Sequence, residues 1–325
     1  MKRNIPLIIG LLSLFLLLFM TLAGPYLPFI DQELKETPLI LLEPEGYIAP
    51  PFPLTKEYPL GSDEKGRDLL SLIVLGMRDT LWVLFLIVLL RYVVAIPLAA
   101  IASIGERNPF SWLVTKWNNM LLYLPVLVIA ILYLNTPYVF FSEDRKILAI
   151  VGLALIEVGR LSHLFQEEIV ALSKQEYVKS GIVVGNSGWG LFKRYYWPAL
   201  RPHLFVNFMQ DLGKVMLLLG QLGFLGIYLE HIEITLDFGI GIIANESIAL
   251  PQLLGENKSL IITNFFIPFT IAAAITWIVL TFYWLGEGLR KYYQLRNHSI
   301  GRRDWFGIKR SGKKQNETEQ SIEAM

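Results

Sequence analysis

Five charged side chains interrupt long apolar runs of this 325-residue sequence. They are Arg91, Glu157, Arg160, Asp211 and Lys214. A charge at the centre of a bilayer costs about 2.5–3.5 kcal/mol on insertion scales, so such residues bind charged solutes or pair with one another. If the runs are helices, Glu157 and Arg160 share one face, and so do Asp211 and Lys214, because each pair is spaced i,i+3.

These charges allow two interpretations. They line a pathway and meet charged groups of a peptide or chelate, or they pair structurally across helices or with a partner subunit. The structural interpretation is favoured overall, with Arg160 extending its head group to the membrane interface. Arg91 is the strongest candidate for a pathway or subunit contact, because no acidic residue lies three or four positions from it.

Catalytic and metal chemistry find little support. A set of four residues could be imagined as a metal or hydrolase site: His163, Glu167, Glu168 and His203. It lacks HExxH spacing, and its histidines lie at the edges of different apolar runs. The stretch 213–215 also lacks the first glycine and the hydroxyl residue of a phosphate-binding loop. We therefore expect no catalytic residue, no metal site and no cofactor bound by this chain.

The elements that carry these charges follow from composition. The chain is 54% hydrophobic and 18% charged, more apolar than a soluble domain of this size could bury, and it has no cysteine. About 20 apolar residues cross a bilayer as a helix, which satisfies its own backbone. We therefore predict an all-α integral membrane protein with six transmembrane helices, at residues 5–27, 80–104, 112–134, 147–164, 204–227 and 261–285.

Four regions are predicted. Residues 1–27 form an anchor helix that is too long for a signal-peptide core and is followed by prolines. Residues 28–79 form a proline-rich extracytoplasmic segment without long helices. Residues 80–290 form the transmembrane domain, and residues 291–325 form a polar tail that we expect to be disordered.

The distribution of Lys and Arg predicts the orientation. With a cytoplasmic N-terminus, the inside segments hold 17 Lys and Arg and the outside segments hold 8. Because positive residues are enriched in cytoplasmic loops, both termini and the loop 165–203 are assigned to the cytoplasm. The basic residues of the tail suit anionic headgroups rather than nucleic acid.

The loop 165–203 is patterned. Ser173 and Glu176 have the spacing of a capping box, which predicts a helix start, and Gly185 suits its end. A second short helix is expected to stop near Trp197, because Pro198 disfavours helical geometry in the residue before it. The aromatic and basic side chains suit either anchors in a protein interface or a belt in the lipid headgroups.

At these residues the sequence resembles a known family. Lys179-Ser180-Gly181, three residues, Gly185, nine residues, Tyr195, one residue and Trp197-Pro198 overlay the EAA loop of ABC importer permeases. That pattern reads EAA, three residues, G, nine residues, I, one residue, LP. The glycine and the proline are both in register.

Three more stretches resemble the permeases of dipeptide, oligopeptide and nickel importers. "YPLGSDEKGRDLLSLIVLGMRDTL" (58–81) is similar to HPLGTDxxGRDxLSRxxxGxRxSL, "GFLG" (223–226) to a motif late in span five, and "LGEGLRKYY" (285–293) to LGDGLRDxL. The sequence departs from the family at the Lys-Ser-Gly triplet, at Trp197, and after span five, where "YLEHIEITLDFG" replaces a PPxPSWG-like segment.

The resemblance implies a translocation subunit of the bacterial cell membrane. Such a subunit pairs with a second, homologous permease, two cytoplasmic ATPase subunits and an extracellular solute-binding protein, and the partner subunits use the ATP. It moves a small peptide or related solute by alternating access. The implied coupling residues are Glu176, Tyr177, Lys179, Ser180, Gly181, Gly185, Phe192, Lys193, Arg194, Tyr195, Tyr196, Trp197 and Pro198, and the candidate pathway or subunit-contact residues are Arg91, Glu157, Asp211 and Lys214.

Two alternatives stay open. An intramembrane enzyme would need a nucleophile or a metal set, and none is recognisable. A degenerate, non-transporting permease that acts as a sensing or assembly scaffold is the stronger rival, because the EAA triplet is replaced. ATP-dependent uptake of any peptide or metal chelate into vesicles would exclude the scaffold.

Overall fold

The computed structural model describes residues 4–42, 46–104, 108–230, 232–235, 241–245 and 247–323. Most of these residues are helical. The helices are α1 Ile5–Leu22, η1 Gly24–Tyr26, α2 Leu69–Ala102, α3 Pro109–Tyr123, α4 Val126–Leu134, α5 Pro137–Phe140, α6 Arg145–Ile156, α7 Val158–Ser173, α8 Glu176–Val183, α9 Gly188–Leu191, η2 Phe192–Tyr196, α10 Trp197–Phe224, α11 Leu250–Glu256, η3 Asn257–Ile261 and α12 Phe266–Glu323.

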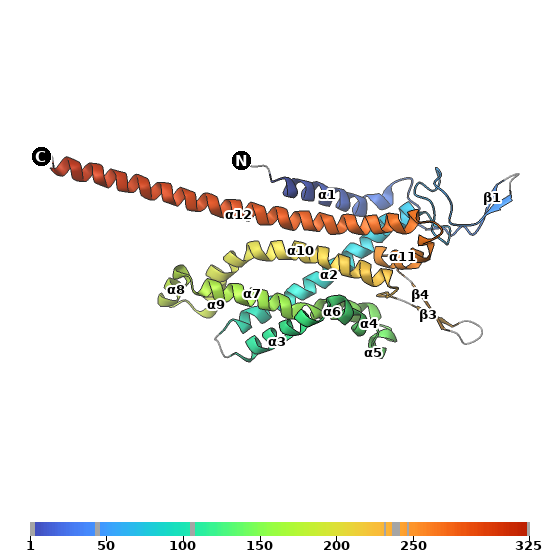
Figure 1. Ribbon diagram of the computed structural model, residues 1–325, viewed down its shortest axis with the longest axis horizontal. Helices are drawn as coiled ribbons and strands as arrows, with labels where there is room; N and C mark the ends of the chain where they lie inside the picture. Colours follow the sequence, from blue (N-terminus) through green and yellow to red (C-terminus); the bar gives the residue numbers. More distant parts are fainter. Residues whose placement is uncertain are drawn as a thin grey trace.

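The long helices form an elongated bundle. α12 lies between α1 and α10 and contacts both, while α2 crosses the bundle obliquely and packs on α7, α6 and α3 (Figure 1). The core along α2 is formed by fully buried aliphatic residues such as Leu84, Ile87 and Val88. α2 is therefore the central helix against which the other helices pack.

The helix α1 is fixed to α12 by small and polar residues. A Cβ on Gly10 would lie 2.8 Å from the backbone nitrogen of Leu285, so the two helices approach closely. Thr281 Oγ1 lies 2.6 Å from Ser13 Oγ, and Trp277 donates its ring N–H to the same hydroxyl. Small residues and interhelical hydrogen bonds are what hold helices together in lipid.

Four helical stretches of the described chain are long and apolar enough to cross a membrane: Ile5–Leu22, Leu69–Ala102, Arg145–Ser173 and Phe266–Leu295. A fifth would be the pair Pro109–Leu121 and Val126–Leu134, which is bent by 96°. The bend follows from Pro125, which forces Leu124 into an extended conformation. Of the six predicted spans, four or five are thus confirmed as helices that could cross a membrane.

The remaining predicted span corresponds to α10. The helix has 28 residues and covers most of the expected range 204–227, but it is not among the stretches apolar enough to cross a membrane. α2 also begins well before residue 80, because Asp68 caps it by accepting the backbone N–H of Ser71 at 2.8 Å. The predicted boundary between residues 79 and 80 therefore falls inside a helix.

The predicted proline-rich segment has no helix between η1 and α2 in the part that the structure describes. It carries the antiparallel hairpin of β1 Ile40–Leu42 and β2 Gly46–Ile48. A second hairpin, of β3 Ile232–Thr235 and β4 Gly241–Ala244, precedes α11. Both hairpins lie at one end of the bundle, and α8, α9 and both termini lie toward the other (Figure 1).

The backbone of α12 is helical to Glu323, within the region 291–325 that the sequence predicts to be a polar tail, and the expected disorder of this tail stays a prediction. The tail sequence is compatible with a helix. No proline follows Pro268, and Lys, Arg, Glu and Gln, which dominate the tail, are good helix formers.

Candidate functional site

Residues 174–198, here termed the connecting segment, join α7 to α10 at one end of the bundle (Figure 1). A helix, α8, begins at Glu176, two residues after the start that a cap at Ser173 predicts, and the predicted capping box is wrong. Ser173 is the last residue of α7, and its hydroxyl donates to its own helix at Val170 O, 2.7 Å away. The break between the helices is made by Gln175, which is extended.

A left-handed turn at Gly185 ends α8, as predicted. Its φ is +84°, and its N–H donates to Ile182 O at 2.9 Å. Asn186 then closes the turn, since its side-chain amide donates to Gly181 O at 2.8 Å. Arg194 donates to Asn186 Oδ1 at 3.2 Å and so ties the turn to the following helix. The connecting segment is therefore a compact structure with its own hydrogen bonds.

Pro198 does not stop the second helix, contrary to prediction. The chain remains helical from α9 through the π-helical turn η2 into α10. In that turn the N–H of Trp197 donates to Phe192 O, five residues earlier, and Pro198 occupies the first turn of α10. A proline in a first turn loses no hydrogen bond, and the π-turn provides the change of register before it.

Two departures from the EAA pattern compensate for each other in space. A Cβ on Gly181 would lie 2.8 Å from the ring of Tyr195, so the smaller residue at position 181 admits the larger one at position 195. The rings of Tyr177 and Tyr195 stack 6.3 Å apart. Tyr195 thus packs against Gly181, at positions where the family pattern has isoleucine and alanine, respectively.

The predicted aromatic anchors are only partly exposed. Phe192, Tyr195, Tyr196 and Trp197 are all half-buried and pack within the segment, with Phe192 stacked on Trp189 at 5.8 Å. Lys193 and Arg194 are exposed, as are Glu176, Tyr177, Lys179, Ser180 and Pro198. The sequence predicted their exposure to solvent but not the internal packing of the rings.

The most exposed apolar residues of the segment were not predicted. Ile182, Val183, Val184 and Trp189 are 52%, 86%, 81% and 73% exposed, and they form what we term the apolar tip. Exposure of so many apolar side chains to water is unfavourable unless a partner or lipid covers them. The sequence signal was the β-branched run immediately before Gly185.

The charged residues of the apolar runs form one connected network, here termed the charge network. Arg91 Nη1 of α2 lies 2.7 Å from Glu157 Oε2, between α6 and α7. Glu157 Oε1 accepts the Nε–H of Arg160 at 2.9 Å, and Arg160 Nη2 lies 3.7 Å from Asp211 Oδ1 of α10. Asp211 also pairs with Lys214 at 3.3 Å. Three packed elements are thereby joined.

Arg91 has a partner that no local spacing revealed. Its side chain is fully buried and also donates to Leu153 O at 3.2 Å. This geometry favours the structural interpretation for Arg91 in this conformation. Glu157 and Asp211 are likewise buried, whereas Lys214 is half exposed. Their assignment to a pathway or subunit contact stays a prediction.

The histidine and glutamate residues at the connecting-segment end form pairs rather than a metal site. His203 Nδ1 lies 3.0 Å from Glu168 Oε1, and this hydrogen bond raises the pKa of His203 against the opposing effect of partial burial. His163 lies 3.5 Å from Glu167. Within the described residues, no group of three or more His, Asp or Glu side chains could hold a metal.

Comparison with curated proteins finds peptide transport permeases. The chain is 25% identical over 226 residues to a dipeptide transport system permease protein of Haemophilus influenzae. The aligned region covers 70% of this chain and 73% of that protein. It is 23% identical over 218 residues to a probable D,D-dipeptide transport system permease protein of Escherichia coli, covering 65% and 66%, respectively. A di/tripeptide transport system permease protein of Pseudomonas aeruginosa is 24% identical over 221 residues, covering 67% and 69%. No protein-family model matches the chain.

These similarities support an ABC importer permease of the dipeptide and oligopeptide family. The relatives are transport permeases and not enzymes, and the apolar helices agree with an integral inner-membrane protein.

The "GFLG" stretch ends α10 against α11. A Cβ on Gly223 would lie 1.9 Å from Pro251 O, so only glycine admits this contact. Gly226 has φ +79°, and the N–H of Ile227 donates to Leu222 O, which is the hydrogen bond of a Schellman cap. The motif therefore fixes both a close approach and a turn.

The "GSDEKGRD" stretch is a closed turn before α2. Asp63 is buried and accepts the backbone N–H of Arg67 at 2.8 Å, while Arg67 Nη2 lies 2.6 Å from Asp63 Oδ2. Arg67 Nη2 also lies 3.5 Å from Glu256 of α11. The motif thus connects the start of α2 to the end of α11.

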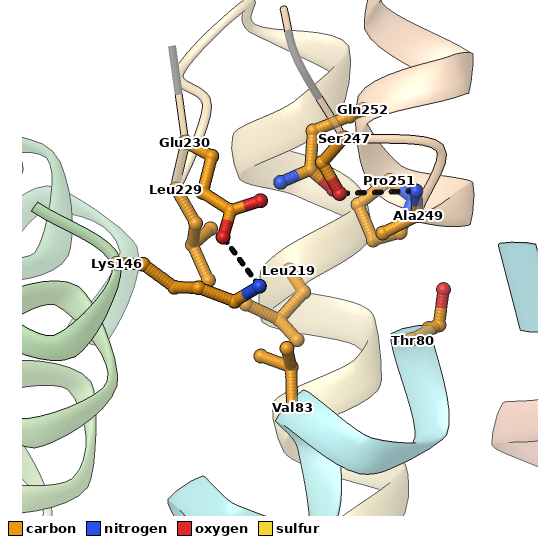
Figure 2. Close-up of a pocket in the computed structure, with 10 residues that line it drawn as sticks. All are labelled: Thr80, Val83, Lys146, Leu219, Leu229, Glu230, Ser247, Ala249, Pro251 and Gln252. Atoms are coloured by element: carbon orange, nitrogen blue, oxygen red, sulfur yellow. Dashed lines mark hydrogen bonds and ion pairs between the residues drawn. The ribbon is translucent and has the colours of Figure 1, made fainter. Parts of the chain in front are cut away.

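The hairpin end of the bundle is held together around a small cavity. Figure 2 shows Lys146 of α6 paired with Glu230, beyond α10, at a cavity that Thr80 and Gln252 also line. Thr80 Oγ1 accepts the N–H of Leu250 at 2.9 Å. The cavity of about 20 Å³ has room for about one water. This end therefore links α2, α6, α10 and α11.

Proposed function

We propose that the chain is the membrane-spanning permease subunit of an ATP-driven importer of small peptides or related solutes. It works by alternating access, together with a second permease, two cytoplasmic ATPase subunits and an extracellular solute-binding protein. The main support is the connecting segment, a compact helical structure that protrudes from the bundle and exposes an apolar tip beside basic residues.

The segment has the properties of a docking surface. The apolar tip of Ile182, Val183, Val184 and Trp189 offers side chains that a partner groove would bury. Lys193 and Arg194 lie beside it and steer the segment to an acidic rim. The internal rings keep the tip in one conformation, which lowers the entropy cost of docking.

The segment is also joined to the charge network by two continuous helices. α7 leads back from the segment toward Arg160 and Glu157, and α10 leads from Trp197 to Asp211, about 21 Å along the helix axis. A rigid helix transmits displacement of its end along its length. Movement of a docked ATPase is thus conveyed to the middle of the bundle.

The compensation between Gly181 and Tyr195 bears on the scaffold alternative. The replaced EAA triplet is what motivated a non-transporting scaffold, yet the close contact of the two residues preserves a packed segment. ATP-dependent accumulation of a dipeptide in vesicles that contain the assembled importer would decide between the two functions. A scaffold would show co-purification with its partners and no accumulation.

The turn at Gly185 gives a test of coupling. We expect Gly185→Val to leave the membrane level unchanged and to lower ATP-driven uptake roughly tenfold, because a left-handed conformation costs a residue with a Cβ about 1–2 kcal/mol, and more when it is β-branched. Membrane level, ATPase co-purification and uptake should be measured in one preparation.

Gly188→Val is the matched control for Gly185→Val. A Cβ would meet nothing within 4 Å at either glycine, but only Gly185 has a positive φ. The control should therefore retain uptake and ATPase association. Equal uptake by the two variants and the wild type would mean that the turn has no part in coupling.

The orientation can be tested in a chain that has no cysteine of its own. Lys56 and Ser187 are both exposed; Lys56 follows the hairpin of β1 and β2, and Ser187 lies between α8 and α9. These elements lie toward opposite ends of the bundle (Figure 1). Because Lys and Arg are concentrated on the connecting-segment side, we expect an impermeant thiol reagent to label Lys56→Cys in intact cells and to label Ser187→Cys only after lysis. The reverse pattern would place the termini outside.

A further inference from the structure

The charge network has an exposed cationic edge. The side chains of Arg160 and Lys214 are 36% and 51% exposed, whereas those of their acidic partners Glu157 and Asp211 are only 9% and 3% exposed. Both cations converge on one atom, since Arg160 Nη2 and Lys214 Nζ lie 3.7 and 3.3 Å from Asp211 Oδ1. The acids lie behind, and the cations face outward together.

The charges of the network do not balance. Arg91, Arg160 and Lys214 supply three positive charges, and Glu157 and Asp211 supply two negative charges. The remaining contact of Asp211 is with the neutral Tyr92 hydroxyl, which donates to Oδ2 at 3.2 Å. The network therefore carries a net charge of +1, within the stretches of α2, α7 and α10 that pack together. An anion at the exposed edge would neutralise it.

The exposed cations also have free donors. Among the described residues, Arg160 Nη1 has no hydrogen-bond acceptor, and Lys214 Nζ has only Asp211. The same face of α10 continues with Leu217, Gln221 and Phe224, which are exposed and uncharged. Apolar surroundings strengthen the attraction of a cation for an anion. A planar guanidinium beside an ammonium suits a carboxylate.

We propose that Arg160 and Lys214 bind a carboxylate of the transported solute, such as the C-terminal carboxylate of a peptide, during its passage. This inference rests on the proposed import function. Glu157 and Asp211 hold the two cations in position. They also reduce the net charge of the network to one positive unit. The attraction between the network and a carboxylate is therefore strong enough to orient the solute and weak enough to release it.

The first experiment needs no transport. Leu217→Cys puts a single thiol one turn from Lys214, at a side chain that is 51% exposed. In the purified chain, we would compare its rates of modification by an anionic and a cationic methanethiosulfonate reagent. Removal of the charge by Lys214→Gln should lower the anionic-to-cationic rate ratio by roughly tenfold, since charges about 6 Å apart interact measurably even at the dielectric constant of water.

Lys193→Gln is the control for this measurement, because it removes an exposed lysine in the connecting segment and should leave the ratio unchanged. Arg160→Gln should lower the ratio as Lys214→Gln does. A ratio that neither Lys214→Gln nor Arg160→Gln changes would overturn the anion site.

The second experiment identifies the source of the carboxylate in the assembled importer. A dipeptide with a free C-terminus should protect Leu217→Cys from the anionic reagent during turnover, and its C-terminal amide should not. Lys214→Gln should slow dipeptide uptake, and Lys214→Arg should retain it. Protection without solute, together with loss of the second permease in Lys214→Gln, would assign the carboxylate to that subunit and overturn the solute assignment. No peptide uptake by the wild type would overturn the proposed function and leave the result of the first experiment standing.

Discussion

Glu157→Leu is expected to lower the free energy of unfolding of the protein by about 3–5 kcal/mol, because it leaves the fully buried Arg91 without a counter-charge. Among the residues that the structure describes, the only other acceptor of Arg91 is the carbonyl of Leu153, which carries no charge. The loss is measured as a lower midpoint of thermal unfolding in detergent and as less folded chain in the membrane.

Two variants isolate the buried charge as the cause. Glu167→Leu makes the same chemical change on α7 at a side chain that is 72% exposed, so it should behave like the wild type. The double variant Arg91→Met with Glu157→Leu removes both buried charges and should recover most of the lost stability. If Glu157→Leu were as stable as Glu167→Leu, or if the double variant were no more stable than Glu157→Leu, the buried charge of Arg91 would not be the cause of the lost stability.

Gly223→Ala is expected to destabilise the contact of α10 with α11 by about 1–3 kcal/mol or more, because the added methyl group meets backbone and not a side chain that can rotate. The Cβ would lie 1.9 Å from Pro251 O. The opposing glycine makes the contact tighter, since a Cβ on Gly255 would lie 2.2 Å from Gly223 O. Hydrogen exchange of α11 should rise together with a fall in the unfolding midpoint.

Gly220→Ala is the matched control for Gly223→Ala, one turn earlier on the same helix. There the nearest atom is the side-chain Cγ2 of Ile275 at 3.2 Å, which can shift, and alanine favours the helix by about 1 kcal/mol. We expect this variant to be as stable as the wild type or slightly more so. Identical unfolding midpoints for the two variants would show that α10 and α11 do not make the close contact.

Local rules predicted the elements that depend on a few neighbouring residues. The glycine turn at Gly185 was predicted correctly, because turn geometry is decided within one or two peptide units, and α8 begins two residues after its predicted start. Failures arose where a second local option existed. Ser173 donates to its own helix instead of capping the next one, and a π-turn lets the chain continue helically into Pro198.

The distribution of exposed side chains in the connecting segment could not be predicted locally. Aromatic residues are the usual anchors of interfaces, so the rings from Phe192 to Trp197 were expected to face a partner. In the structure these rings pack on one another and on Gly181. The residues of the apolar tip are exposed instead. Which side of a short helix is covered depends on the helices packed beside it.

The sequence by itself determined that this protein is built from apolar helices in a defined order, because hydrophobicity and helix-ending residues act along the chain. It also carried the permease motifs, which the similarities to peptide transport permeases support. Only the tertiary structure decided that Arg91 pairs with Glu157, 66 residues away, and that Gly223 meets Pro251. A charge or a glycine in one helix specifies no partner, since the partner is set by how the helices cross.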